Sequence, residues 1–299
     1  MKKILIRLFI IISFLLLPFT TIAQELDPHN DSDRQFSQGW KHAAGDLKYE
    51  LGALTAGVAY LGLKEWKWGS SSFRINDENW FGMNTGSGGA DKLGHLYSAY
   101  AMSEFLTHRL NYKTAAMDYS AKYGAIYSWG MMLIVEIFDG VSMDHGFSYE
   151  DLIMNSTGIA ASYLKNTVPW LKDKFDLRVE YLPSDGMKGF YPVTDYSGMK
   201  YIAALKLNGF DNLRNTPLKY LELHLGYYTR GFKDEDRNYF DKKKTNLYLG
   251  FGLNLEEFLF KKIKKGLGKP ADYLNTFFKY YQAPYTYIEC PLNKRTASE

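Results

Sequence analysis

Three pairs of polar residues with helical spacing are the features of this 299-residue chain that could carry chemistry. The pairs are Asp91 with His95, Glu136 with Asp139, and Asp151 with Asn155. Spacings of three or four residues place both members of a pair on one face of a helix. Glu136 also lies inside the apolar run 131–138, where a carboxylate is costly to bury without a polar partner. We therefore expect its helix to direct Glu136 toward other polar groups.

Converging carboxylates and an imidazole allow two interpretations. The first is a metal site, with His95, Glu136 and Asp139 as ligands and Asp151 as a general base. The second is a hydrogen-bonded polar core that fixes the register of the helices. A histidine in such a position is more often a hydrogen-bonded core residue than a metal ligand. We therefore favour the polar core, and we predict no cofactor.

Two of the acidic residues also have local explanations. The sequence Ser148-x-x-Asp151 is a capping box that opens a helix. Asp91 is expected in a first helical turn, where the helix dipole favours a negative charge. Neither residue therefore needs a catalytic role to account for its position.

Other motifs do not match known sites. The segment GSGGADK lacks the Gly-Lys-Ser/Thr ending of a phosphate-binding loop. Residues 139–150 have the length of a calcium loop but lack oxygen ligands at its third and fifth positions. We expect His108, His145 and His224 to be solvated or strand-surface residues. The chemistry is thus confined to the three helical pairs.

Apolar periodicity predicts that these pairs lie on helices in the first half of the chain. The predicted helices are Asp46–Lys64, Asp91–Leu110, Ala115–Phe138 and Tyr149–Leu164. They are rich in Ala, Gly, Ser, Met and Tyr, which permits close helix packing. The segment Gly69–Gly89 has the composition of a loop. None of the helices contains 18 uninterrupted apolar residues. We expect a compact helical bundle over residues 89–170. The sequence leaves open both a shallow association of this bundle with a membrane and membrane spanning.

After Asp176 the period changes from about 3.6 to 2, which indicates β-strands. Strands are predicted over residues 177–181, 201–207, 221–227 and 247–255, followed by helices over 256–267 and 271–281. The first of these helices carries a basic cluster, Lys261 to Lys265. The fold class is therefore α+β: a small-residue helical bundle, then an antiparallel β-rich region over 176–290 with two C-terminal helices.

Three of the predicted strands alternate apolar with polar or small residues, whereas 201–207 is more uniformly apolar. The alternation is compatible with an antiparallel sheet that has one face on a core. Apolar residues that alternate with Gly, Asn and Tyr are also the pattern of outer-membrane barrel strands, although four or five strands are fewer than a closed single-chain barrel needs. We favour the sheet, either in solution or against a membrane, over an oligomeric or incomplete barrel.

The first 23 residues have the features of a secretory signal peptide. A basic start is followed by an apolar run, Leu8 to Leu17, and by Thr21-Ile22-Ala23 before Gln24. The formal net charge of +3 comes from three basic residues in this segment, so the remaining chain, which starts with a lead-in over 24–88, is neutral. A neutral chain argues against sequence-independent nucleic-acid binding. The single cysteine, Cys290, argues against a disulfide framework, and we expect no N-terminal lipidation because no cysteine follows the signal peptide.

Three ordered sequence blocks resemble the YfiM-like family of bacterial periplasmic or outer-membrane proteins. The blocks are DKLGH (Asp91–His95), EIFDG (Glu136–Gly140) and GFSYEDLIMNSTG (Gly146–Gly158). Their layout is similar to that of VanZ-like helical domains. The resemblance covers roughly residues 45–170 and implies a motif set of Asp91, Lys92, His95, Glu136, Asp139, Gly146, Asp151, Asn155 and Gly158. It implies an envelope location and no particular reaction.

Two functional hypotheses follow. The first is an exported envelope protein that associates with membrane lipid or with an envelope protein partner, in a structural or interaction role. The second is a metal-dependent enzyme acting on a lipid or cell-wall precursor. We favour the first, because it rests on the signal peptide, the small-residue helices and the apolar strands together, whereas the second rests on the polar pairs alone. The sequence leaves the oligomeric state open.

Overall fold

The computed structural model describes residues 39–184, 195–236, 239–260 and 269–297. The predicted signal peptide, most of the lead-in and the basic cluster Lys261 to Lys265 lie outside the described residues. The chain divides into two compact units. The helical unit ends at Lys172 and the sheet unit begins at Asp173. This architecture confirms the predicted α+β fold class.

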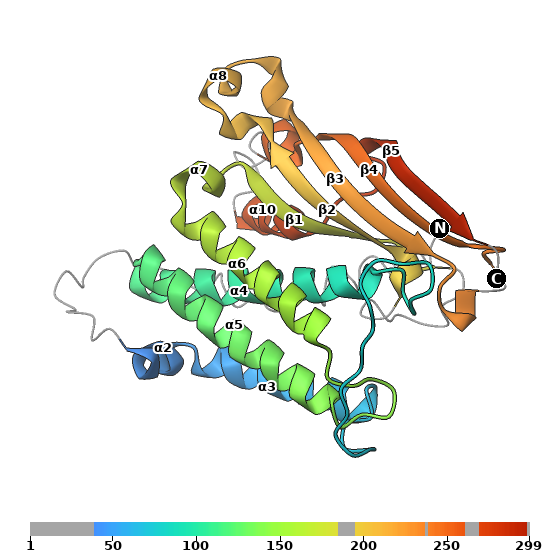
Figure 1. Ribbon diagram of the computed structural model, residues 1–299. Helices are drawn as coiled ribbons and strands as arrows, with labels where there is room; N and C mark the ends of the chain where they lie inside the picture. The colour runs from blue at the N-terminus through green and yellow to red at the C-terminus, as the bar shows by residue number, and fades with distance from the viewer. Residues whose placement is uncertain (1–38, 185–194, 237–238, 261–268, 298–299) are drawn as a thin grey trace. The chain divides into compact units, whose positions relative to one another are not determined.

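Three long helices that pack on one another form the centre of the helical unit (Figure 1). The helices of this unit are α2 (Trp40–Asp46), α3 (Lys48–Lys64), α4 (Ala90–Thr114), α5 (Met117–Asp139), α6 (Tyr149–Thr167) and α7 (Pro169–Lys172). The central three are α4, α5 and α6. The four predicted helices match α3 to α6 within a few residues at each end, whereas α2 was not predicted. Among the described residues, no helix combines the length and the apolar character required to cross a membrane.

The helices of this unit pack through small residues as well as through apolar ones. One buried cluster comprises Ala43, Leu47, Leu106, Leu110 and Tyr123, and a second comprises Ala99, Met132 and Ile159. At the crossing of α4 and α6, a Cβ added to Gly158 would lie 2.0 Å from the carbonyl oxygen of Leu96. Only a glycine therefore permits the two backbones to approach this closely, and that approach brings the first turns of α6 against α4.

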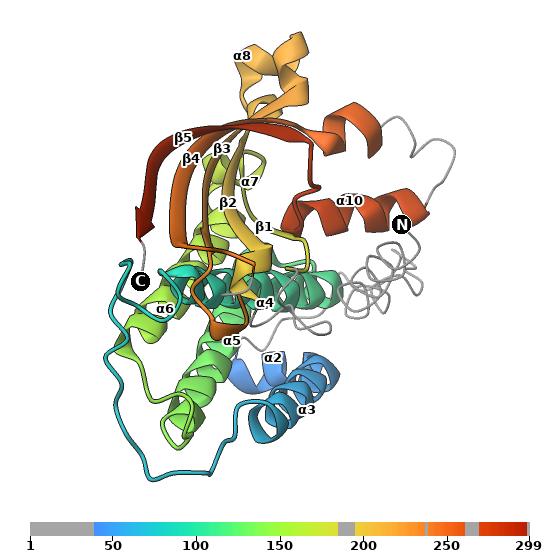
Figure 2. The same cartoon turned by 90° about the vertical axis from the view of Figure 1, so that its right-hand side faces the viewer.

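A five-stranded antiparallel sheet, in the order β1-β2-β3-β4-β5, forms the sheet unit. The strands are β1 (Phe175–Tyr181), β2 (Met199–Lys206), β3 (Leu221–Arg230), β4 (Lys243–Leu253) and β5 (Tyr287–Ala297). The unit also contains the short helix α8 (Asp211–Arg214), a π-helical turn (Glu256–Phe260) and the helix α10 (Lys269–Tyr280). The last of these agrees with the second predicted C-terminal helix. Figure 2 shows α10 on the concave side of the sheet.

The strand β5 was not among the predicted strands. Its alternation is interrupted at Pro291, which pairs with Tyr248 next to a register shift between Leu247 and Tyr248. Proline cannot donate to a strand ladder and is confined to edge strands and bulges. Since β5 is the edge strand of this sheet, the proline is tolerated, but it conceals the period of two in the sequence.

The sheet buries its polar face and exposes its apolar face. Glu222 and His224 of β3 are 0% and 1% exposed, whereas Leu223 and Leu225, which alternate with them, are 38% and 48% exposed. The prediction that His224 is a strand-surface residue was therefore wrong. The alternation was correctly located, but the solvent-facing side is the apolar one.

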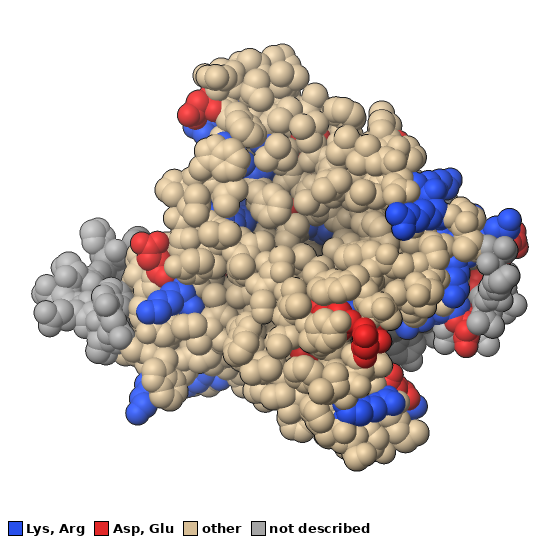
Figure 3. Space-filling view, in the orientation of Figure 1, with Lys and Arg blue, Asp and Glu red and all other residues tan. Residues whose placement is uncertain are grey.

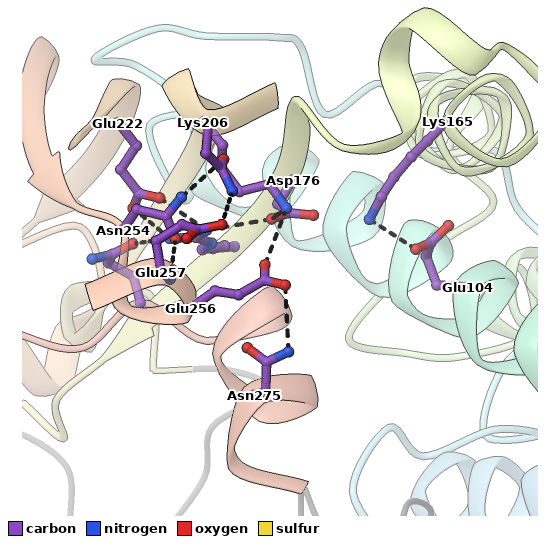
Figure 4. Close-up of polar contacts among 12 residues, drawn as sticks. Glu104, Lys165, Asp176, Lys206, Glu222, Asn254, Glu256, Glu257 and Asn275 are labelled. Atoms are coloured by element: carbon purple, nitrogen blue, oxygen red, sulfur yellow. Dashed lines mark hydrogen bonds and ion pairs between the residues drawn. The ribbon is translucent and has the colours of Figure 1, made fainter. Parts of the chain in front are cut away.

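A network of charged side chains occupies the buried face. The guanidinium of Arg178 donates to both carboxylate oxygens of Glu222, at 2.5 and 3.1 Å, and to Asp176 at 3.3 Å. Lys206 forms an ion pair with Asp176 at 2.9 Å (Figure 4). Burial alone would raise the pKa of Glu222, but the charge of Arg178 and the bond from His224 hold it below its usual value. Paired charges thus take the place that apolar side chains occupy in an ordinary sheet core.

We predict that Gly158→Ala destabilises the helical unit by about 2 kcal/mol, because the added methyl group forces the backbones of α4 and α6 apart. The matched control is Gly130→Ala, in the interior of α5, where an added Cβ meets no atom within 4 Å. There the higher helix propensity of alanine should stabilise the unit by up to about 1 kcal/mol. Urea unfolding followed by tryptophan fluorescence measures this unit, because all six tryptophans lie at or before Trp170. Equal effects of the two changes would contradict the close contact.

Candidate functional site

The predicted polar residues come together at one end of the α4–α6 contact. Helix α4 begins after Gly89, whose φ of +88° is favourable for glycine. Helix α6 begins with Ser148, whose side chain accepts a hydrogen bond from the backbone N–H of Asp151 at 3.2 Å. This cap is the one that the sequence predicts. Both helix starts thereby hold their first-turn acidic residues in defined positions.

The buried ammonium of Lys92 lies at the centre of the cluster. It donates to Asp151 Oδ1 at 2.8 Å, to Glu78 Oε2 at 2.5 Å and to Asp91 Oδ2 at 3.2 Å. The Lys92 side chain is 2% exposed. One cation therefore joins the starts of two helices to the loop that precedes α4.

Glu78 was not predicted as a site residue, because it lies in a loop without periodicity. It is half of the only acidic pair, Asp77-Glu78, between Lys67 and Asp91. A buried ammonium such as that of Lys92 has to be paired with carboxylates. The acidic pair Asp77-Glu78 was therefore the one sequence feature that could have indicated Glu78 as a partner. Burial and the neighbouring charge of Asp91 raise the pKa of Glu78 to about 7. The carboxylates of the cluster are therefore in excess over the cations.

The imidazole of His95 lies between the carboxylates of three helices. Its Nε2 atom is 3.9 Å from Asp91 Oδ1 and 3.9 Å from Asp151 Oδ1, and its Nδ1 atom is 3.3 Å from Glu136 Oε1. Glu136 is 1% exposed and accepts a hydrogen bond from the Asn155 amide at 3.0 Å. Burial would lower the pKa of His95, but Glu136, Asp151 and Asp91 together raise it to about 10.

Asp139 has a different partner from the rest of the predicted set. Its Oδ1 atom accepts a hydrogen bond from the indole of Trp68 at 2.6 Å, and burial raises its pKa to about 7. The three residues whose ligand atoms lie within 4.8 Å of one another are Asp91, His95 and Asp151. This group shares only His95 with the ligand set considered from the sequence.

A second buried ion pair connects the other ends of α4 and α6. Glu104 is fully buried and accepts hydrogen bonds from Lys165 and Ser162, each at 2.9 Å (Figure 4), and from Asn166. Burial would raise the pKa of Glu104, but the charge of Lys165 outweighs it and lowers the value to about 2. Half-exposed His108 also lies 3.7 Å from Glu104. The pair was not predicted, and its buried hydrogen bonds between α4 and α6 indicate a role in packing.

Residues 77–167 match the model of a family described as "Predicted periplasmic lipoprotein (DUF2279)". This range contains the whole cluster, from Glu78 to Asn155. No curated protein and no solved structure matches the chain. The match agrees with the predicted export, and the chain is an exported protein of the cell envelope. The match does not extend to the YfiM-like or VanZ-like names. The one cysteine of the chain, Cys290, lies in β5.

We predict that the stability of the helical unit depends on the protonation of His95. Its pKa of about 10 exceeds the value of 6.5 expected in the unfolded chain. Its contribution is therefore complete below about pH 6.5 and is lost as the pH rises toward 10. The free energy of unfolding should fall across this window in the wild type and fall less steeply in His95→Gln. The control is His42→Gln, at an exposed His–Asp pair, and identical pH profiles for His95→Gln and wild type would contradict the prediction.

We also predict that Lys92→Met destabilises the helical unit by about 3–5 kcal/mol, since it leaves buried carboxylates without a counter-charge. The matched control is Lys67→Met, which removes an exposed ion pair with Asp144 and should cost about 1 kcal/mol or less. Chemical unfolding followed by tryptophan fluorescence provides both values. A cost for Lys92→Met no greater than that of the control would show that the cluster is not the anchor of these helices.

Proposed function

We propose that this chain is a membrane-associated protein of the cell envelope that binds a lipid surface through the outward-facing side of its sheet. This surface is called the outer apolar face. It consists of Leu221, Leu223, Leu225, Leu249, Phe251, Leu253, Ile288 and Leu292. Their exposed fractions range from 37% to 71%. An apolar face of this kind, on a sheet whose polar face is buried, is the observation that carries the proposal.

The strand register makes these side chains contiguous. Leu223 is paired with Phe251, which is paired in turn with Ile288, and Leu225 is paired with Leu249. Paired residues on one face of an antiparallel sheet have adjacent side chains. Antiparallel sheets in water ordinarily expose the polar face. A contiguous exposed apolar patch marks a contact with a protein or a membrane.

Basic residues at one end of the same sheet favour a lipid surface as the occupant. They are Lys243 and Lys244 at the start of β4, and Lys294 and Arg295 near the end of β5. Figure 3 shows blue side chains at this edge and a largely uncharged surface beside them. Lysine and arginine at such a rim extend their charged ends toward anionic headgroups, and each near the surface contributes about 1 kcal/mol.

The helical unit has an exposed apolar stripe of its own. Ile126, Trp129 and Ile137 of α5 are 47%, 43% and 46% exposed, and their spacing places them along one side of the helix. Ile153 of α6 is 48% exposed. Tryptophan is enriched where a protein meets the membrane interface. The stripe therefore supports the same kind of environment for this unit.

We predict that the double variant Leu223→Glu/Phe251→Glu loses at least about tenfold in affinity for vesicles of phosphatidylethanolamine and phosphatidylglycerol. Two carboxylates would have to enter the apolar part of the bilayer, each at a cost below the ~2–4 kcal/mol of a lysine or arginine at full depth. Both side chains are exposed, so the fold should be kept. Vesicle flotation with the purified chain gives the bound fraction.

The matched control is Tyr285→Glu, at a side chain that is 94% exposed and not part of the outer apolar face, which should bind as the wild type does. Vesicles of phosphatidylcholine alone should bind more weakly, because they lack the anionic headgroups. If the double variant binds vesicles as well as the wild type, the proposal is wrong. It is also wrong if sedimentation shows that the same face instead holds two copies of the chain together.

A further inference from the structure

Asp91, His95 and Asp151 have the composition and the spacing of a metal site. Asp91 and His95 come from successive turns of α4, and Asp151 comes from the first turn of α6. The His95 Nε2 atom lies 3.9 Å from one oxygen of each carboxylate. Ligands about 2.0–2.2 Å from a tetrahedral zinc ion lie about 3.4 Å apart. The three ligand atoms lie within 4.8 Å of one another, and Asp151 Oδ1 also accepts a hydrogen bond from Lys92 at 2.8 Å. The two aspartate side chains therefore have to rotate to bring their ligand atoms to this spacing.

We infer that these three residues bind a divalent transition-metal ion of the Zn²⁺ class at the α4–α6 contact. Imidazole together with carboxylates suits zinc and its neighbours, whereas sites for magnesium and calcium consist of oxygen ligands alone. Three protein ligands leave a position for water or a substrate, as in catalytic zinc sites. The inferred site is independent of the lipid-binding face proposed for the sheet unit.

The second nitrogen of His95 provides separate support. A metal-bound histidine almost always donates its other ring N–H to a carboxylate, which orients the ring. His95 Nδ1 lies 3.3 Å from the buried Glu136, and the amide of Asn155 holds Glu136 from the far side at 3.0 Å. Glu136, inside the apolar run 131–138, thus lies where it can accept the second ring N–H of a metal-bound His95.

One buried polar atom at this place lacks a hydrogen-bond partner among the described residues. It is Oδ1 of Asn155. Asn155 is fully buried and follows Asp151 by one helical turn on the same face. Buried polar groups without partners are uncommon and indicate a strained or functional site. The cluster is therefore more than a set of closed ion pairs.

Charge balance favours a divalent cation over a proton on His95. Four carboxylates, from Glu78, Asp91, Glu136 and Asp151, face the single ammonium of Lys92 and the imidazole of His95. Metal binding displaces one proton from the imidazolium of His95 to solvent and puts two positive charges in its place. Lys92 contacts Asp91 through Oδ2, whereas the Asp91 oxygen nearer to His95 is Oδ1. In Asp151 the same oxygen, Oδ1, accepts from Lys92 and lies nearest to His95.

We predict that the purified full chain, stripped with a chelator, binds one Zn²⁺ with a rise in the melting temperature of the helical unit. His95→Gln and Asp91→Asn should each abolish this rise, and Glu136→Gln should weaken binding about 10- to 100-fold. Isothermal titration calorimetry and a thermal scan followed by tryptophan fluorescence measure the two effects. Binding should be weaker at low pH because the ion competes with the proton of His95, and Mg²⁺ should bind far more weakly than Zn²⁺.

His42→Gln is the matched control, because it removes an exposed histidine that pairs with Asp46 four residues away, and it should leave Zn²⁺ binding unchanged. Asp91 is partly exposed, so Asp91→Asn keeps the test valid if His95→Gln unfolds. Visible absorption of the Co²⁺ form should show ligation that Asp91→Asn removes. Absence of Zn²⁺ binding to the wild type, or equal binding by wild type and Asp91→Asn, would overturn the inference and leave His95 as a protonated ion-pair partner.

Discussion

The arrangement of the helical unit depends on one buried ammonium. Lys92 has hydrogen bonds to carboxylates from α6, from α4 itself and from the loop before α4. A buried charge that loses its partners costs several kcal/mol, so the loop and α6 have one favourable register relative to α4. Gly158 then allows the two helix backbones to approach closely one or two turns further along. Together these two constraints place His95 between Asp91, Asp151 and Glu136.

In the sheet unit, too, buried charges that bind one another fix how the elements pack. Arg178, Glu222 and Asp176 satisfy one another on the buried face, and Glu222 accepts a hydrogen bond from His224 at 2.8 Å. Because side chains alternate along a strand, a polar interior forces the intervening leucines outward. The outer apolar face is therefore a direct consequence of the buried charge network and not a separate feature.

Local patterns predicted the elements better than they predicted the partners. The helical period located α3 to α6, and the spacing of Asp151 and Asn155 correctly put them on one face of α6. The period of two located three strands, and a uniformly apolar run located β2. The period is the same whichever face meets solvent, so the side occupied by His224 was assigned wrongly. Glu78 lies in a loop without periodicity, and Lys165 lies in the last turn of α6. The partner of each residue is set by tertiary contacts, which the spacing of residues along the chain does not reveal. Asp139 was placed with His95 by spacing alone, whereas its partner is Trp68, 71 positions earlier in the chain.

The sheet unit places charge inside and apolar side chains outside, and the energy of this arrangement supports the proposed surroundings of the chain. Each of the eight side chains of the outer apolar face would gain roughly 1 kcal/mol on leaving water, because about half of its surface is exposed. The total is on the order of 8 kcal/mol, comparable with the whole stability of a domain. The lipid contact that we propose would recover that energy while the buried ion pairs stay dry. Because the basic rim lies beside the apolar face on one sheet, the proposed contact would engage both at once.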